Sequence, residues 1–234
     1  MKTLLALLAL LFAGKLGKVL LTAGTMFLSM FVYAISFGWA YAAGVVAMLF
    51  LHEMGHFIAA RKRGLEVGAP VFIPFVGAWV ALKATDLDPE TEAYVGLGGP
   101  LLGTAAAFLC YLYGLDTGER LWLAVAYTGF MLNAFNLIPL SPLDGGRIVR
   151  VISPRIWFLG VPLLIGAFLW KPSPLLLIIA ILAAPQLWAA WRGEDAAVRH
   201  ITATRVKWVY GAQYLALVAA LALLAFEVHE RLGA

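Results

Sequence analysis

The chain has 234 residues, of which 63% are hydrophobic and 13% charged, and its formal net charge is +4. Soluble domains are about half apolar and a quarter charged, and a soluble domain of this size could not bury so much apolar surface. With one cysteine, Cys110, the composition also excludes a disulfide-rich scaffold, as well as a disordered or collagen-like chain. It indicates a polytopic membrane protein, so the positive charge is interpreted by its placement and not as a nucleic-acid-binding surface.

Seven apolar segments approach the length of about 20 residues that a membrane-spanning helix needs. They are 19–37, 39–60, 93–113, 121–138, 156–170, 174–191 and 208–227. The connection at Gly38 is so short that the first two segments should form a helical hairpin. The sequence therefore predicts an all-α polytopic membrane protein with about six to seven transmembrane helices.

The placement of Lys and Arg supports this layout, because cytosolic loops of membrane proteins carry an excess of both residues. If the spans alternate from a cytosolic N-terminus, all but three of the 17 basic residues fall on the cytosolic side. The three exceptions are Arg120, Lys171 and Arg231. We therefore expect a multi-pass protein with a cytosolic N-terminus, and the Ala- and Leu-rich composition suggests a prokaryotic cell membrane.

Segment 65–83 is apolar but differs from the other apolar segments. Its residues Gly68, Pro70, Pro74 and Gly77 oppose a helix, and the β-branched and aromatic residues between them favour extended backbone. Irregular backbone at membrane depth must lie against protein or a water-filled cavity. We expect a re-entrant β strand or hairpin packed against the helices.

Within segment 39–60, His52, Glu53 and His56 form an HExxH motif. Residues four apart share one face of a helix, so both imidazoles can reach one metal ion, and the neighbouring Glu53 can act as a base. Three ionisable groups inside a membrane helix are costly without a partner, and a zinc ion would be such a partner. A polar cluster that satisfies itself without metal is the alternative interpretation.

A catalytic zinc ion usually has three protein ligands and one open position, so a third ligand must come from elsewhere. Asp144 is the strongest candidate, because the alternating topology places it at the same depth as the two histidines. An Asp-Gly turn with a solvated carboxylate would be favoured for this dipeptide alone. Three other residues are less suitable by their positions in an outward-running helix, a loop and the C-terminal edge: Cys110, His200 and His229.

Two motifs together resemble the site-2 protease family of intramembrane zinc metalloproteases: HEMGH at 52–56 and NLIPLSPLDGG at 136–146. Segment 65–83 resembles the re-entrant β element of that family. The Gly-rich run at 96–100 matches a Gly-Pro signature of the family's core helices. HExxH alone occurs in many metalloproteases, whereas the pair of motifs in membrane segments is specific.

The resemblance implies one Zn²⁺ ion per chain, with His52, His56 and Asp144 as ligands. It implies that Glu53 is the general base. It also implies a catalytic role for Asn136, which matches an asparagine that helps to hold the substrate or the oxyanion. The alternative for Asn136 is that its amide only satisfies backbone groups freed near Pro139.

The resemblance covers roughly residues 39–150. We expect one integral-membrane metalloprotease domain over residues 1–234 with this core, and neither a PDZ nor a CBS domain. The implied activity is hydrolysis of peptide bonds within or near transmembrane segments, as in regulated intramembrane proteolysis. The expected partners are a transmembrane protein substrate and the lipid bilayer, with no nucleic acid, and the sequence indicates no oligomeric state. Since a substrate helix must unwind before cleavage, one hypothesis is that a free strand edge in 65–83 receives it; the alternative is that this segment is a structural plug.

The main alternative is a membrane metal-ion transporter with an HExxH-containing helix. Such a transporter needs polar groups on facing helices and usually a histidine-rich loop, and this sequence has only four histidines. A membrane protein that only binds metal would not need the base Glu53. Prenyl-protein proteases share HExxH, but the Asp-Gly motif fits them poorly.

Overall fold

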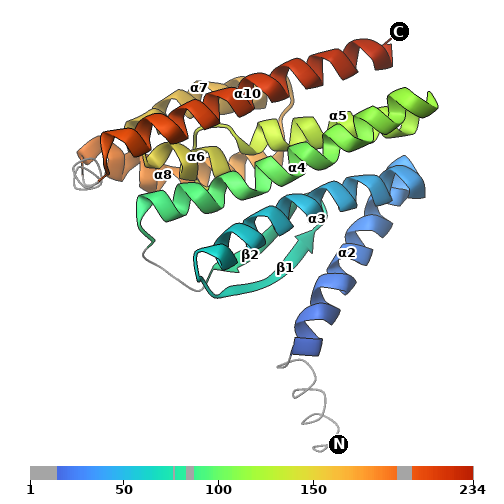
Figure 1. Cartoon of the computed structure of the whole chain (residues 1–234), viewed down its shortest axis with the longest axis horizontal. Helices are drawn as coiled ribbons and strands as arrows, with labels where there is room; N and C mark the ends of the chain where they lie inside the picture. The colour runs from blue at the N-terminus through green and yellow to red at the C-terminus, as the bar shows by residue number, and fades with distance from the viewer. Residues whose placement is uncertain (1–14, 76, 83–86, 194–201, 234) are drawn as a thin grey trace, which may run out of the picture.

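Helices form nearly all of the structure, which is a computed structural model that describes residues 15–75, 77–82, 87–193 and 202–233. Figure 1 shows α10, α4 and α5 side by side above α3, with a small β-hairpin below α3 and α2 slanting away. The longer helices are α2 (Lys15–Phe37), α3 (Trp39–Lys62), α4 (Pro89–Thr117), α5 (Arg120–Asn136), α8 (Pro174–Arg192) and α10 (Thr204–Gly233). The shorter elements are β1 (Val67–Ile73), β2 (Gly77–Leu82), α6 (Asp144–Arg150), η1 (Pro154–Leu159) and α7 (Gly160–Trp170).

Five of the seven predicted apolar segments lie within a single helix. Segment 121–138 overlaps α5 and runs two residues beyond it, and segment 156–170 is divided between η1 and α7. Among the described residues, α2, α3, α4, α8 and α10 are long and apolar enough to cross a membrane. Helix α5 has 17 residues, and the apolar stretch Pro154–Trp170 is also shorter than a full span. The all-α, multi-pass class is confirmed, and the number of six to seven spans stays a prediction.

Helices α2 and α3 form the expected tight hairpin. Only Gly38 separates them, and its φ of +82° lies in the region that glycine adopts without strain. Its N–H donates to the carbonyl of Ala34, and its carbonyl accepts from Ala42. The turn therefore joins two helices with no intervening loop.

The extended element expected in segment 65–83 is confirmed as an antiparallel hairpin of β1 and β2. Strand β1 contacts α2, and both strands contact α3. The side chain of Thr22 donates to the carbonyl of Pro70 at 2.7 Å, and the N–H of Phe72 donates to Oγ1 of Thr25 at 3.2 Å. Helix α2 thus covers the edge of β1 that faces away from β2.

Helix α4 is central and contacts α3, α5, α6 and α10. It begins with Pro89 at the first helical position, and the Asp88 carboxylate accepts the N–H of Thr91 at 2.9 Å. Burial raises the pKa of Asp88, but the hydrogen bonds from Thr91 outweigh burial and hold the pKa below its ordinary value. This cap fixes where the central helix starts.

Candidate metal centre

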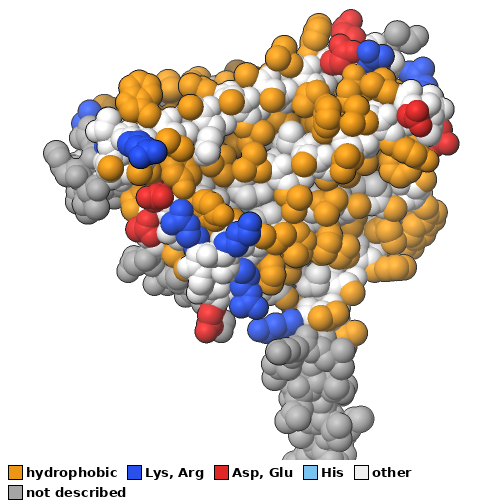
Figure 2. Space-filling model, in the orientation of Figure 1, with side chains coloured by type: hydrophobic (Ala, Val, Ile, Leu, Met, Phe, Trp, Pro, Cys, Tyr) orange, Lys and Arg blue, Asp and Glu red, His pale blue; other side chains and the backbone are white. Residues whose placement is uncertain are grey.

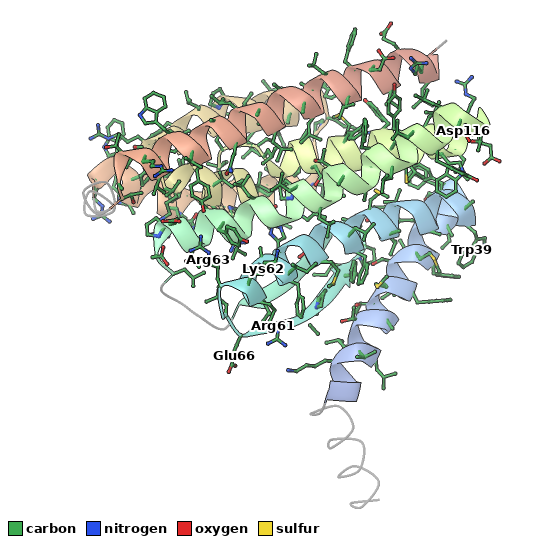
Figure 3. The ribbon with its side chains drawn as sticks, viewed as in Figure 1. Trp39, Arg61, Lys62, Arg63, Glu66 and Asp116 are labelled. Atoms are coloured by element: carbon green, nitrogen blue, oxygen red, sulfur yellow. The ribbon has the colours of Figure 1, made fainter. Side chains whose placement is uncertain are left out.

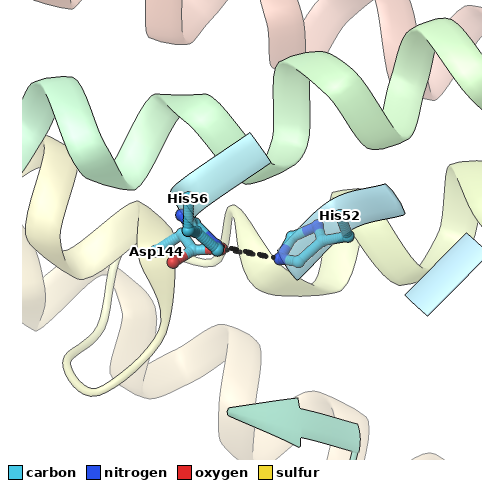
Figure 4. A group of neighbouring side chains, drawn as sticks. All are labelled: His52, His56 and Asp144. Atoms are coloured by element: carbon cyan, nitrogen blue, oxygen red, sulfur yellow. Dashed lines mark hydrogen bonds and ion pairs between the residues drawn. The ribbon is translucent and has the colours of Figure 1, made fainter. Parts of the chain in front are cut away.

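Three predicted ligands meet between α3 and α6 (Figure 4). The Nε2 atoms of His52 and His56 are 3.1 Å apart, and each lies 3.1 Å from Oδ2 of Asp144. All three residues are at most 7% exposed, although Asp144 is 88 residues from His56 in the sequence. The structure therefore brings together two histidines on one helix and an aspartate at the start of another.

The other ring nitrogen of each histidine, Nδ1, is hydrogen-bonded to an oxygen atom. Nδ1 of His56 lies 2.8 Å from the carbonyl of Val95, which only accepts, so this nitrogen carries the proton. Nδ1 of His52 lies 2.8 Å from Oδ1 of Asn133. The amide nitrogen of Asn133 donates to Gly129 at 2.7 Å, which fixes the amide so that its oxygen faces His52. In the neutral imidazoles both Nε2 lone pairs therefore point into the centre.

Three acceptor atoms so close together need a cation or a proton between them. Zinc bound tetrahedrally at about 2.0–2.2 Å places its ligand atoms roughly 3.3 Å apart, which is near the 3.1 Å found here. Two imidazoles and one carboxylate are a common catalytic zinc set with a fourth position open. The residues fit a zinc ion.

Glu53 lies beside these ligands without being one of them. It is 7% exposed and directly follows His52 on α3. It also interacts electrostatically with both imidazoles, with Asp144 and with Arg147. A buried carboxylate next to a metal centre is positioned to accept a proton from water there.

Asp144 is positioned by a folded loop and two glycines. The loop from Leu137 turns back on α6, and an added Cβ at Gly145 would collide with the carbonyl of Leu137. At Gly146 an added Cβ would collide with the backbone of Ser141. The indole N–H of Trp157 donates to the carbonyl of Gly146 at 2.8 Å. These contacts place the first residue of α6 at the centre.

Residues 40–119 and 115–159 match the family model described as Peptidase family M50, and together they are just over half of the chain. The chain belongs to peptidase family M50. The resemblance to site-2 zinc metalloproteases that rests on the two motifs is thereby confirmed. The matched residues contain all three members of the metal centre.

Named relatives each match a little under half of this chain. Zinc metalloprotease MJ0392 of Methanocaldococcus jannaschii is 32% identical over 110 residues, which are 45% of this chain and 32% of that protein. Rip3 of Mycobacterium tuberculosis, whose name assigns it to the zinc metalloproteases, is 32% identical over 48% of this chain and 31% of its own. The matches thus span about a third of the length of these relatives. A solved structure, the site-2 protease from M. jannaschii, aligns over 73% of this chain and 85% of that one, with 24% identity and a TM-score of 0.47.

Asn136, which the sequence predicts to be functional, does not contact the metal centre in the way that Asn133 does. The side chain of Asn136 donates to the carbonyl of Leu132 on its own helix, so its substrate role in this M50 chain stays a prediction. Asn133, one turn earlier, contacts His52 and is 1% exposed. An asparagine inside an apolar helix was a signal, but nothing in the sequence points to its partner 81 residues away.

The alternative third ligands lie apart from the centre or outside the described residues. The ring of His229 lies tilted against that of Tyr127, with centroids 5.7 Å apart, and Cys110 is half-buried among apolar residues. His200 lies outside the residues that the structure describes. Within the described part of the chain, the cluster of His52, His56 and Asp144 is the group that can hold a metal ion.

Glycines of the M50 core bring α4 against the metal centre. An added Cβ at Gly98 would collide with the backbone of Gly55, and one at Gly99 would collide with the ring of His56. At Gly103 an added Cβ would collide with the amide of Asn133. These glycines therefore let α4 approach α3 and α5 closely beside the metal centre.

Proposed function

We propose that this chain is an intramembrane zinc metalloprotease that hydrolyses peptide bonds within or near transmembrane segments of membrane proteins. The carrying observation is the buried cluster of His52, His56 and Asp144, with Glu53 beside it. Both histidines and Glu53 stand on α3, a helix long enough and apolar enough to cross a membrane. Membership of family M50 and relatives named zinc metalloproteases support the same activity.

The residues divide the chemistry between them. His52, His56 and Asp144 would hold a zinc ion, which would supply Lewis acidity that polarises a peptide carbonyl and lets water lose a proton near neutral pH. Glu53 accepts that proton and delivers it to the leaving amine. Asn136 holds the substrate or the developing oxyanion through its side-chain amide.

The substrate backbone must leave its helix before attack, and we propose that it pairs with the outer edge of β2. Because the N–H of Phe72 points to α2, Phe72 and its opposite residue Ala78 form a pair without hydrogen bonds to each other. The N–H of Ala78 then faces the outer edge of β2. This edge offers main-chain hydrogen bonds to an extended peptide, whereas α2 covers the corresponding edge of β1.

Proline at Ala78 tests this pairing, because proline removes the outward N–H and leaves the β1–β2 ladder intact. We expect Ala78→Pro to lower kcat/KM for a single-span substrate while zinc content stays that of the wild type. Trp79→Pro is the matched variant, since it removes an inward N–H and should disturb the hairpin itself. Wild-type cleavage by Ala78→Pro would exclude strand pairing at this edge.

We further propose the domain organisation of the chain, its orientation and the membrane in which it lies. The M50 match supports one metalloprotease domain with its core at 39–150. The gathering of basic residues at one end of the helices supports a cytosolic N-terminus. We place the protein in a prokaryotic cell membrane, in keeping with its relatives from M. jannaschii and M. tuberculosis.

The decisive experiment uses the purified full chain in detergent with a single-span membrane protein as substrate. Wild type should cleave, and Glu53→Gln, Asp144→Ala and chelator-treated wild type should not. Glu53→Gln should still bind zinc, which separates loss of the base from loss of the metal. Equal cleavage by Glu53→Gln would refute the base assignment, and zinc flux into sealed vesicles without cleavage would favour the transporter.

A further inference from the structure

A groove of about 880 Å³ opens between the end of α3 and the starts of α4 and α10. Its walls are mostly apolar, with Leu97, Leu101 and Ala105 from α4 and Val209 from α10 among the lining residues. Leu101 and Val209 are exposed although they are large and hydrophobic. In a protein that spans a membrane, such a groove is open to the acyl chains of lipid.

The charged residues of the groove gather at one end. Of the described residues that line it, Lys62, Arg63 and Arg205 are basic and Glu90 is acidic. Arg63 is already engaged, since its Nη2 lies 3.4 Å from Oε1 of Glu90 and its guanidinium sits over the ring of Tyr94 at 4.4 Å. The groove therefore combines an apolar body with a mouth that carries an excess of positive charge.

The charged mouth lies at the end of the bundle where basic residues gather. Figure 2 shows Lys and Arg side chains at this end and hydrophobic side chains over much of the rest of the visible face. Figure 3 shows Lys62 and Arg63 at the end of α3 next to the start of α4. Basic pockets between membrane helices at such an end bind the head groups of anionic lipids.

We propose that this groove binds one anionic phospholipid, with an acyl chain along the apolar wall of α4 and the phosphate between Lys62 and Arg205. Charge complementarity selects an anionic over a zwitterionic head group, and the apolar length selects a lipid over a free phosphate. The site touches the helix pair that supports the metal centre, because Gly55 and Gly98 line the groove and Gly55 precedes His56.

The proposal does not depend on protease activity, so it is tested by binding alone. The full chain, purified in neutral detergent, is titrated with phosphatidylglycerol or phosphatidylcholine, and bound lipid is counted by native mass spectrometry. We expect one tight phosphatidylglycerol per chain and clearly weaker phosphatidylcholine. Equal binding of the two lipids would overturn the proposal, as would displacement by soluble glycerol phosphate or by a single-span peptide.

Charge variants locate the head group. Lys62→Ala and Arg205→Ala should each weaken phosphatidylglycerol binding about fivefold, and the double variant should weaken it more than either single variant. Arg61→Ala is the matched control, since Arg61 stands on the same turn of α3 but lines a different groove with α2 and β1 (Figure 3). It should change binding less than twofold. An equal loss in Arg61→Ala would show that the lipid responds only to general surface charge and would overturn the site.

A bulky side chain placed inside the groove tests whether the acyl chain binds there. Ala105 is exposed in the groove, so Ala105→Trp occupies the apolar wall without altering the charges or the buried core. We expect this variant to lose at least tenfold in phosphatidylglycerol affinity while its unfolding temperature without lipid stays that of the wild type. Undiminished affinity in the folded Ala105→Trp protein would place the lipid outside the groove and refute the proposal.

Discussion

The metal centre consists of three candidate ligands and of the groups that orient them, and the sequence predicts the first set better than the second. The HExxH spacing and the Asp-Gly turn point to the three residues that could hold the metal, because each motif carries a recognisable pattern of residue types. Asn133 and the Val95 carbonyl orient the rings and could not be found in this way. An asparagine or a backbone oxygen has no distinctive spacing, and both partners come from other helices.

Asn133 should control how tightly the centre holds zinc, because its oxygen fixes the ring of His52. We expect Asn133→Leu to weaken zinc affinity about 10- to 100-fold, measured by competition with a fluorescent chelator. Asn133→Asp keeps an acceptor and should retain more affinity than Asn133→Leu. Asn136→Ala is the comparison on the same helix and should leave zinc affinity unchanged. A larger loss of zinc affinity in Asn136→Ala than in Asn133→Leu would contradict the structure.

Gly99 should tolerate no side chain, since an added Cβ would collide with the ring of His56. Gly99→Ala is expected to displace that ring, to lower zinc content and to cost about 1–3 kcal/mol of stability. Gly24→Ala provides the control, because an added Cβ there meets nothing within 4 Å. Zinc analysis and thermal unfolding of both proteins check this, and wild-type zinc content in Gly99→Ala would show that α4 is not packed so closely.

At the scale of elements, the sequence predicts where helices lie better than how they meet. Hydropathy and turn residues located the apolar segments and the extended element in 65–83. The short helix α6 was not anticipated, because Gly145 and Gly146 indicate a turn. Their actual role is to let the chain from Leu137 pack against the start of α6, a contact that depends on tertiary structure.

A methyl group at Gly145 should therefore disrupt the packing of the loop that leads to Asp144. An added Cβ would collide with the carbonyl of Leu137, which also accepts from the hydroxyl of Tyr214 at 2.7 Å. We expect Gly145→Ala to abolish cleavage and zinc binding together. Gly118→Ala serves as a control away from the centre, where only backbone strain is expected. Gly145→Ala protein with normal zinc content would contradict the described loop.

At the scale of the whole molecule, the distribution of charge suggests how the protein sits in the membrane. Lys62, Arg63 and Arg205 lie where α3 ends and α10 begins, and Arg120 and Arg231 lie at the opposite ends of α5 and α10. The sequence predicts this separation because alternating spans carry charge to alternate sides. It does not predict the lipid-sized groove, which arises only when α3, α4 and α10 pack together.

Cysteine labelling in intact cells tests the orientation. Glu66 and Asp116 lie at opposite ends of the helices in Figure 3. In a Cys110→Ser background, Asp116→Cys should react with a membrane-impermeant maleimide from outside, whereas Glu66→Cys should react only after permeabilisation. The reverse pattern would place the N-terminus and the basic end outside.

The central claim is that one zinc ion is held by His52, His56 and Asp144, and zinc content measures it most directly. Purified wild type and Glu53→Gln should each contain one zinc per chain by elemental mass spectrometry, and His56→Ala and Asp144→Ala should contain less than a tenth of that. Unfolding temperatures confirm that all four proteins are folded. A full complement of zinc in folded Asp144→Ala, or none in the wild type, would contradict the account.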